Sequence, residues 1–467
     1  MTDTVTTQPV PPHRTAEEIG RTPLGPRPLP PLGEQRPAGE LSSVDTVLPN
    51  GLRVIAVRRA AVPIVEVRLR IPFGSPSAAD APGHAARAEV LANTLLTGTA
   101  RRDRVQLDTD LALVGGDLGT VVDPERLSIG GSALASGLDT LLDVLADVLT
   151  GAVHSDEETA RERDRLVERI TLARSQPSVI AREALQRRRY GDHPFSVEVP
   201  EAALVAQVTA EQVRDLHRGS VLPRGSVLVL VGDVDPERVV AQVGGALSGW
   251  AGQDAARELS PLPPVVGGDL LLVDRPGAVQ SQIRLSSQAI ARTDPRYPAL
   301  QLANMVFGGF FSSRLVENIR EDKGYTYSAR SYLEFTPSGA TLLVDADTAS
   351  EVTAAAVLET RYELGRLGLV PPAGEELETA RRYAVGSLLT ATSSQAGLAS
   401  FLANLAVAGL GVDWLRGYPT RLAEVTAEQV AQAALEFFAP SAFTGVVVGD
   451  AGRLAPQFHA LGGVTLP

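Results

Sequence analysis

Cysteine is absent from all 467 residues of this chain. Disulfide bonds, a thiolate nucleophile and cysteine-ligated zinc or iron–sulfur centres are therefore excluded. Histidine is scarce as well: the chain has six, and no two lie within five positions of each other. That spacing excludes a helical pair of histidine ligands such as H-E-x-x-H or H-x-x-E-H. A tight metal site in this chain would have to be built from isolated histidines and carboxylates.

Long apolar runs and an excess of positive charge are also missing. No stretch of 18 apolar residues occurs, so we expect no membrane span. The N-terminus, MTDTVTTQPVPPHR, lacks the apolar core of a secretory signal, and we expect a cytoplasmic protein. With 43 basic and 55 acidic residues the net charge is −12, which disfavours a nucleic-acid or anionic membrane partner.

The chain is too long for a single hydrophobic core, and its composition suggests where it divides. Residues 1–44 contain nine prolines and little apolar periodicity, which predicts a flexible N-terminal extension. A recognition segment is the alternative reading of that stretch. Residues 251–268 are rich in proline and glycine and predict a linker between domains at 45–250 and 269–467.

Local patterns predict strands and helices in alternation. Residues 64–71 (IVEVRLRI) alternate strictly between apolar and polar, which is typical of a strand with one buried face. Residues 226–233 (SVLVLVGD) predict a buried strand, and helical patterns cover 84–96, 137–150 and 155–176.

An internal repeat relates the two predicted domains. AQVTAEQV at 206–213 recurs as AEVTAEQV at 423–430, and each copy leads to an apolar strand that closes in V-G-D. The distance from Thr209 to Asp233 equals that from Thr426 to Asp450, which indicates a duplicated domain. We therefore predict an α+β fold of two homologous two-layer α/β sandwiches, each with helices over one face of a largely antiparallel sheet.

Three segments in the same order resemble the M16 family of zinc peptidases (pitrilysin, insulinase and mitochondrial processing peptidase). Residues 48–78 are similar to its opening strand pair, residues 162–196 to its long helix followed by Tyr-Gly-Asp-His-Pro, and residues 307–331 to the signature of its second domain. The resemblance covers about 45–460. It implies the M16/LuxS-like metallohydrolase fold, in which one chain forms half of a clamshell that encloses peptides.

The resemblance breaks at the zinc site. Active members carry H-x-x-E-H, in which two histidines bind zinc and the glutamate acts as general base. Aligned on the following Gly-Thr pair, the ligand positions here hold Glu89 and Asn93, and the base position holds Ala92. His84 lies five residues too early to be a ligand, and we expect it at the surface or at a helix start. The third ligand position holds Arg169, whose guanidinium would repel Zn²⁺.

The signature of the second domain is retained. The resemblance assigns to Arg320 and Tyr327, seven residues apart, the pair that reaches the zinc site, holds the substrate backbone and supports the tetrahedral intermediate. A helix-end surface charge and an ordinary strand tyrosine are the alternative readings. The segment Gly308, Gly309, Phe310 and Ser312 lies in a predicted loop before a helix at 313–321. Its glycines either admit a bound peptide closely or form a turn before a capping serine.

Some M16 enzymes of this length divide the site between two subunits, one with H-x-x-E-H and the other with the Arg/Tyr pair. The resemblance therefore implies a non-catalytic, substrate-binding subunit that binds no metal or cofactor itself. Its partner in a heterodimer would carry H-x-x-E-H and the zinc, and its substrates would be peptides. A structural or peptide-binding protein with no role in proteolysis is the alternative. A serine hydrolase using Ser312 or Ser313 is disfavoured because the context is not G-x-S-x-G.

Overall fold

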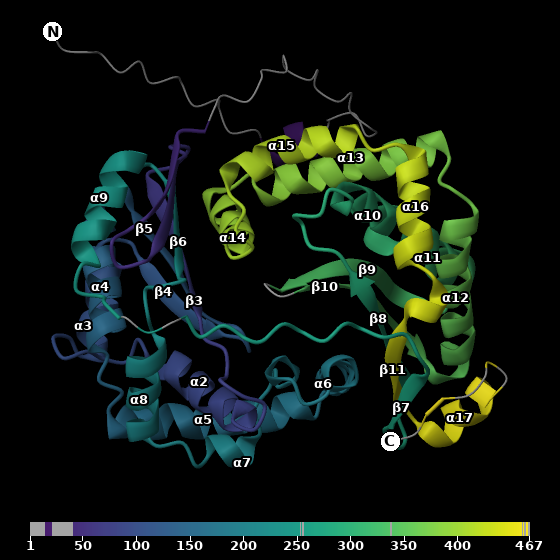
Figure 1. Cartoon of the computed structure of the whole chain (residues 1–467), viewed down its shortest axis with the longest axis horizontal. Helices are drawn as coiled ribbons and strands as arrows, with labels where there is room; N and C mark the ends of the chain where they lie inside the picture. The colour runs from purple at the N-terminus through teal and green to yellow at the C-terminus, as the bar shows by residue number, and fades with distance from the viewer. Residues whose placement is uncertain are drawn as a thin grey trace, which may run out of the picture. The chain divides into compact units, whose positions relative to one another are not determined.

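The computed structural model describes residues 15–20, 41–252, 254, 256–336, 339–459, 461, 464 and 465. The chain separates into two units, Met1–Glu40 and Leu41–Pro467. In the first unit the described residues include one short helix, α1 (Ala16–Gly20). The rest of the predicted extension lies outside the described residues, apart from residue 15 and residues 41–44. Figure 1 labels the helices and strands of the second unit, Leu41–Pro467.

A six-stranded sheet organises the first half of this unit. In spatial order its strands are β1 (Ser43–Val47), β2 (Arg53–Arg58), β6 (Val227–Gly232), β3 (Ile64–Pro72), β5 (Arg126–Leu134) and β4 (Asp117–Val122). The β2–β6 pair is parallel and the other pairs are antiparallel. The accompanying helices are α2 (Ala81–Thr94), α3 (Arg104–Leu113), α4 (Leu138–Gly151), α5 (Asp156–Arg174), α6 (Pro177–Tyr190), α7 (Ala202–Val205), α8 (Ala210–Ser220) and α9 (Pro236–Ala246).

A five-stranded sheet organises the second half. Its order is β7 (Leu270–Asp274), β11 (Thr444–Gly449), β8 (Gln280–Ala289), β10 (Gly339–Ala349) and β9 (Thr326–Thr336). Its helices are α10 (Tyr297–Asn304), α11 (Arg314–Val316), α12 (Thr353–Leu369), α13 (Gly374–Ala391), α14 (Gln395–Ala406), α15 (Val412–Ala423), α16 (Ala427–Phe437) and α17 (Ala451–His459). Two π-helical turns, η3 (Met305–Gly309) and η4 (Glu317–Asp322), flank α11.

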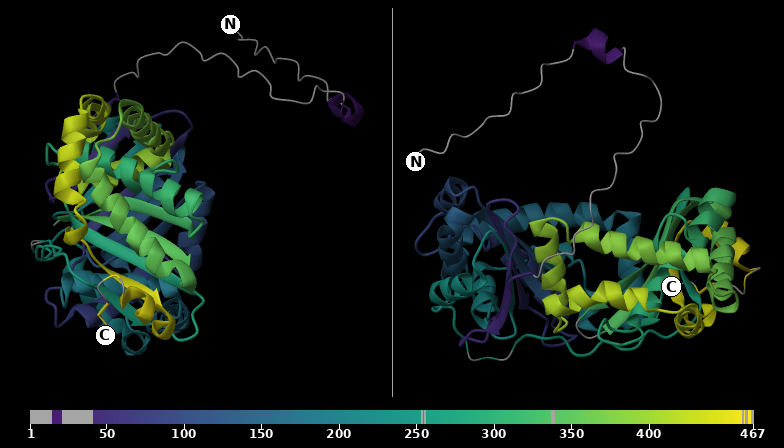
Figure 2. Two further views of the ribbon diagram at one scale, coloured as in Figure 1. Left: turned by 90° about the vertical axis from the view of Figure 1, so that its right-hand side faces the viewer. Right: turned by 90° about the horizontal axis from the view of Figure 1, so that it is seen from above.

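Five strands have the same order and directions in the two sheets, which confirms the predicted duplication, and the first sheet adds β1 at its edge. In each, the last strand of the half (β6 or β11) enters the middle of the sheet, parallel to one neighbour and antiparallel to the other. The repeated Thr-x-x-Gln signals both form capping boxes, at Thr209 with Gln212 and at Thr426 with Gln429. The predicted pair of homologous two-layer sandwiches is therefore the observed fold, and the left view of Figure 2 shows helices of the second half lying in front of its strands.

Each half also lends one helix to the other. Helix α14 packs on β3 and β6 of the first sheet, and α6 packs on β8 and β11 of the second. As a result β6 is buried on both faces: Leu228 and Leu230 belong to the core of the first half, while Val227, Val229 and Val231 pack in the cluster that contains α14. Burial on both faces explains why this strand is a continuous apolar run.

Polar contacts hold both exchanged helices in place. On α14, the Gln395 amide donates to the Arg59 and Ile64 carbonyl oxygens at 2.6 and 3.1 Å. On α6, the Arg189 guanidinium donates to Thr341 Oγ1 at 3.0 Å and pairs with the Glu334 carboxylate at 2.9 Å. Because Arg189 is almost fully buried, this ion pair makes the contact between the halves specific and costly to break.

The predicted domain boundaries at 250/251 and 268/269 fall in the connection between α9 and β7. The described residues of this connection form no helix and no strand, and Arg257 makes a single β-bridge with Phe73. Strand β1 begins at Ser43, so residues 43 and 44 of the predicted extension already belong to the first sheet. No helix among the described residues is long and apolar enough to cross a membrane.

Candidate functional site

The positions that correspond to the zinc site meet between helices α2 and α5. Glu89 and Asn93 lie one turn apart on α2, and Asn93 Nδ2 donates to the Glu89 carbonyl oxygen at 2.7 Å. Arg169 of α5 reaches the same place, because its guanidinium donates to Asn93 Oδ1 at 3.1 Å. Ala92 points into the core of the first half and is 3% exposed. Three of the four positions named from the sequence thus come together.

The chemistry of this cluster does not fit a zinc ion. A guanidinium has no lone pair to give a metal, and the amide of Asn93 already accepts from it. Burial raises the pKa of Glu89, and the charge of Arg169 opposes that rise in part. The positive charge at this site is therefore supplied by the Arg169 side chain, where an active member of the family would hold a zinc ion. No group of three or more His, Asp or Glu suited to a metal occurs within the part of the chain that the structure describes.

His84 belongs to the packing of the first half. It lies in the first turn of α2, as predicted, but the prediction of a surface position is wrong, since only 6% of it is exposed. Its Nε2 lies 2.7 Å from the Phe73 carbonyl oxygen, and burial lowers the pKa of the ring. The hydrogen bond to Phe73, the residue after β3, gives the ring nitrogen a partner and so allows the side chain to be buried.

Arg320 and Tyr327 lie together on the second half. Arg320 is in η4, and Tyr327 follows at the start of the edge strand β9. The Arg320 guanidinium carbon lies 5.4 Å from the centre of the Tyr327 ring and 4.7 Å from that of Phe311. Two aromatic faces thus hold one guanidinium by cation–π contact. We call Phe311, Arg320 and Tyr327 the Arg–Tyr cluster.

The cluster is open to a ligand. Tyr327 is 89% exposed and Phe311 is 59% exposed, and the Tyr327 hydroxyl has no hydrogen-bond partner among the described residues. The preceding tyrosine, Tyr325, is half-buried against the core instead. Gly324, with φ of +63°, makes the turn that joins η4 to β9 and sets the two side chains side by side. Sequence reasoning missed Phe311, which only the contact geometry shows.

The glycine segment has a packing role. Gly308 and Gly309, expected in a loop, are the last residues of the π-helical turn η3, and the predicted helix at 313–321 is α11 continued by η4. A Cβ at Gly308 would lie 2.8 Å from Ser331 Oγ, and one at Gly309 would lie 3.0 Å from the Asn304 carbonyl oxygen.

Close packing of η3 therefore accounts for both glycines. Phe310 stacks on Tyr383 at 4.9 Å, whereas Ser312 is exposed. Ser313 sits at the N-cap of α11, but its hydroxyl makes no cap hydrogen bond. Peptide binding by Gly308, Gly309, Phe310 and Ser312 stays a prediction.

Comparison with known families gives two matches that together span most of the described chain. Residues 53–200 match Insulinase (Peptidase family M16), and residues 207–383 match the Peptidase M16 inactive domain. The first match includes the Glu89–Asn93–Arg169 cluster, and the second includes the Arg–Tyr cluster.

Several relatives carry the name of uncharacterized zinc protease. One from Streptomyces coelicolor is 28% identical over 62% of this chain and 63% of its own length. One from Mycobacterium tuberculosis is 29% identical over 65% of this chain and 70% of its own. The aligned region thus spans under two thirds of the Streptomyces protein.

Solved structures agree on the fold. The Pseudomonas fluorescens structure described as a peptidase M16 inactive domain has a TM-score of 0.79 at 21% identity, covering 87% of this chain and 98% of its own. A protease from Helicobacter pylori has a TM-score of 0.78 at 18% identity, covering 88% and 100%. Because both halves match families of one group and the fold agrees throughout, the chain belongs to the M16 peptidase family.

Proposed function

We propose that this chain is the non-catalytic, substrate-binding subunit of a two-chain zinc endopeptidase, and that it supplies the Arg–Tyr cluster to the active site of a partner that carries H-x-x-E-H. The observation that carries the proposal is a contrast within the chain. The zinc-ligand positions are closed by the contact of Arg169 with Asn93, whereas Tyr327 is exposed and lies against Arg320, which also pairs with Glu321 at 3.4 Å.

The chemistry of the cluster suits this role. Arg320 offers several N–H donors in a rigid fork, which can hold peptide carbonyl oxygens. The Tyr327 hydroxyl can donate to an oxygen that gains negative charge during peptide cleavage. Contact with two aromatic rings restricts the guanidinium before substrate arrives, which lowers the entropy lost on binding. Zinc in the partner would activate the attacking water, a function that Ala92 cannot assist.

The experiment is reconstitution with an H-x-x-E-H subunit from the same genome. Peptide cleavage is expected only with both chains present. Arg320→Ala and Tyr327→Phe should each lower kcat/KM by about 10²- to 10³-fold, as loss of a transition-state donor does. Tyr327→Phe should leave stability unchanged, because Tyr327 is exposed. Arg187→Ala and Tyr362→Phe, which alter exposed residues elsewhere, should leave kcat/KM unchanged.

Two results would overturn the proposal. Full activity of both cluster variants would remove Arg320 and Tyr327 from the site. Purification from native extract that never recovers an H-x-x-E-H subunit would favour instead the alternative role, a peptide-binding or structural member of the family without proteolysis.

A further inference from the structure

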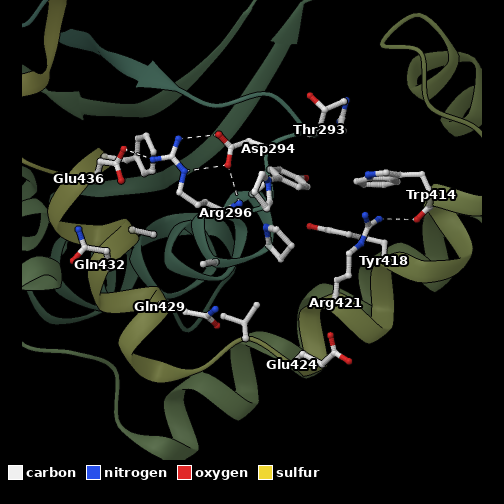
Figure 3. Close-up of a pocket in the computed structure, with 18 residues that line it drawn as sticks. Thr293, Asp294, Arg296, Trp414, Tyr418, Arg421, Glu424, Gln429, Gln432 and Glu436 are labelled. Carbon is white, nitrogen blue, oxygen red and sulfur yellow. Dashed lines mark hydrogen bonds and ion pairs between the residues drawn. The ribbon is translucent and has the colours of Figure 1, made fainter.

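A cavity of about 570 Å³ lies in the second half, away from both clusters described above. Helices α10, α15 and α16 form its walls, as Figure 3 shows. Its size is that of a small-ligand or peptide pocket. None of the residues that line it belongs to the Arg–Tyr cluster.

Three stacked aromatic rings dominate one wall of this cavity. The Trp414 and Tyr418 rings lie 4.5 Å apart at an angle of 17°, and the Tyr418 and Tyr297 rings lie 5.5 Å apart at 19°. Trp414 and Tyr418 face the same way because they are one helical turn apart on α15. The Arg421 guanidinium lies over the Trp414 ring at 4.8 Å. We call Tyr297, Trp414 and Tyr418 the aromatic wall.

Two polar atoms of the aromatic wall are buried without a partner. Trp414 Nε1 and the Tyr418 hydroxyl are shielded from solvent, and neither makes a hydrogen bond within the described part of the chain. Tyr418 as a whole is only 5% exposed. An indole N–H can only donate, and leaving a buried donor unpaired costs about 1–3 kcal/mol. A matching occupant would therefore bring hydrogen-bond acceptors next to flat apolar groups.

Three arginines (Arg292, Arg296 and Arg421) and three carboxylates (Asp294, Glu424 and Glu436) line the cavity, so its charges balance and a neutral occupant suits it. Arg296 is neutralised by Asp294 and Glu436, at 2.8 and 2.6 Å. The Glu424 carboxylate, by contrast, has no ion-pair partner among the described residues.

A polyproline II segment has this combination of properties. Its proline rings pack flat on aromatic faces, its carbonyl oxygens have no donors of their own, and it loses little entropy on binding. We propose that this cavity is a binding site for a proline-rich peptide in the polyproline II conformation. As a probe, the sequence itself contains a peptide of this chemistry, PLGPRPLPPL at 23–32, which carries one arginine.

The experiment titrates a synthetic PLGPRPLPPL peptide into the full-length protein by calorimetry. The receptor carries alanine in place of Pro28, Pro30 and Pro31, so that the probe competes with no copy of its own sequence. Saturable binding is expected. A probe with its prolines replaced by alanine should bind at least about 10-fold more weakly, since the rigid conformation is lost.

Conservative variants then locate the site. Tyr418→Phe removes only a hydroxyl, and Trp414→Phe removes the N–H while keeping an aromatic ring. Each should weaken binding about 5-fold, the effect of one hydrogen bond. Trp250→Phe is the matched control, because that indole donates to the Val221 carbonyl oxygen in the first half and lies outside the cavity. It should leave the affinity unchanged, and thermal melting checks that every variant is folded.

Three outcomes would overturn the proposal: no saturable binding up to about 1 mM peptide, equal binding of the alanine probe, or unchanged affinity in both Trp414→Phe and Tyr418→Phe. None of them bears on cleavage by the two-chain enzyme, so the two proposals fail independently.

Discussion

In the first half of the protein, Asn93 bonds to Arg169 and to the Glu89 backbone between two helices, while in the second half Tyr327 of the edge strand β9 is exposed beside Arg320. The two sheets share the order of five strands, but the two clusters lie on elements that do not correspond: α2 and α5 in the first half, η4 and β9 in the second. The difference between the two clusters therefore reflects both their side chains and the elements that carry them.

The most demanding test of this comparison rebuilds the missing site. Glu89→His, Ala92→Glu, Asn93→His and Arg169→Glu together should let the chain hold about one Zn²⁺ per molecule after dialysis, because the four positions sit on two adjoining helices. Metal analysis measures the stoichiometry. The same variant with Arg169 retained is the control and should hold far less zinc. Equal, low metal content in both would mean that the backbone has also diverged.

Removing the buried ion pair between the halves is expected to have the next largest effect, on the free energy of unfolding. Arg189→Ala should lower the free energy of unfolding by about 4 kcal/mol, because it leaves Glu334 and Thr341 without their buried partner. Urea denaturation measures this loss. Arg187→Ala, on the exposed side of the same helix, should change stability by less than about 0.5 kcal/mol. Similar values for both variants would show that α6 does not depend on this ion pair.

Glu125 of the first half should make stability depend on pH. Burial raises its pKa to about 7, and the charge of Glu334 in the second half contributes to the rise. The folded protein thus binds a proton more tightly than the unfolded chain, so stability falls as pH rises from about 4.5 to 7, by up to about 3 kcal/mol. Glu125→Gln should remove this slope in denaturation curves recorded across that range. An unchanged slope would assign it to other groups.

The smallest expected effect tests the repeat itself. Thr209→Ala and Thr426→Ala each remove a capping hydroxyl that lies 3.3 Å from a backbone nitrogen, that of Gln212 or Gln429. Each should cost about 1 kcal/mol, and the double variant should show their sum. Thermal or urea unfolding measures all three variants. Unequal losses would show that the two copies have diverged in how much their helices contribute.

Local patterns in the sequence predicted much of this structure. Strict alternation gave β3 at Ile64–Pro72, and the apolar run at 226–233 gave β6, because burial of one or both faces leaves a direct trace in residue order. The repeat gave the duplicated fold. The exchange of α6 and α14 could not be predicted, since an apolar helix face does not say which sheet it will cover.

The candidate site was predictable only where the resemblance supplied a motif. That motif pointed to Glu89, Asn93 and Arg169, yet it did not say that the arginine would bond to the asparagine. Phe311 was missed because no motif marks its contact with Arg320. The aromatic wall was missed because its members are far apart in the chain: Tyr297 lies more than a hundred residues before Trp414. Spacing of Trp414, Tyr418 and Arg421 at helical intervals was the one available signal.

The reciprocal placement of α6 and α14 has a consequence for the covalent chain. Each sheet has one face covered by a helix that the other half encodes, so neither half alone can bury its apolar surface. A single nick in the connection at 251–268 should therefore leave both fragments associated, and the fragments produced separately should complement each other to restore the fold. The connecting peptide sets the local concentration of the two pieces, but the swapped helices hold them together.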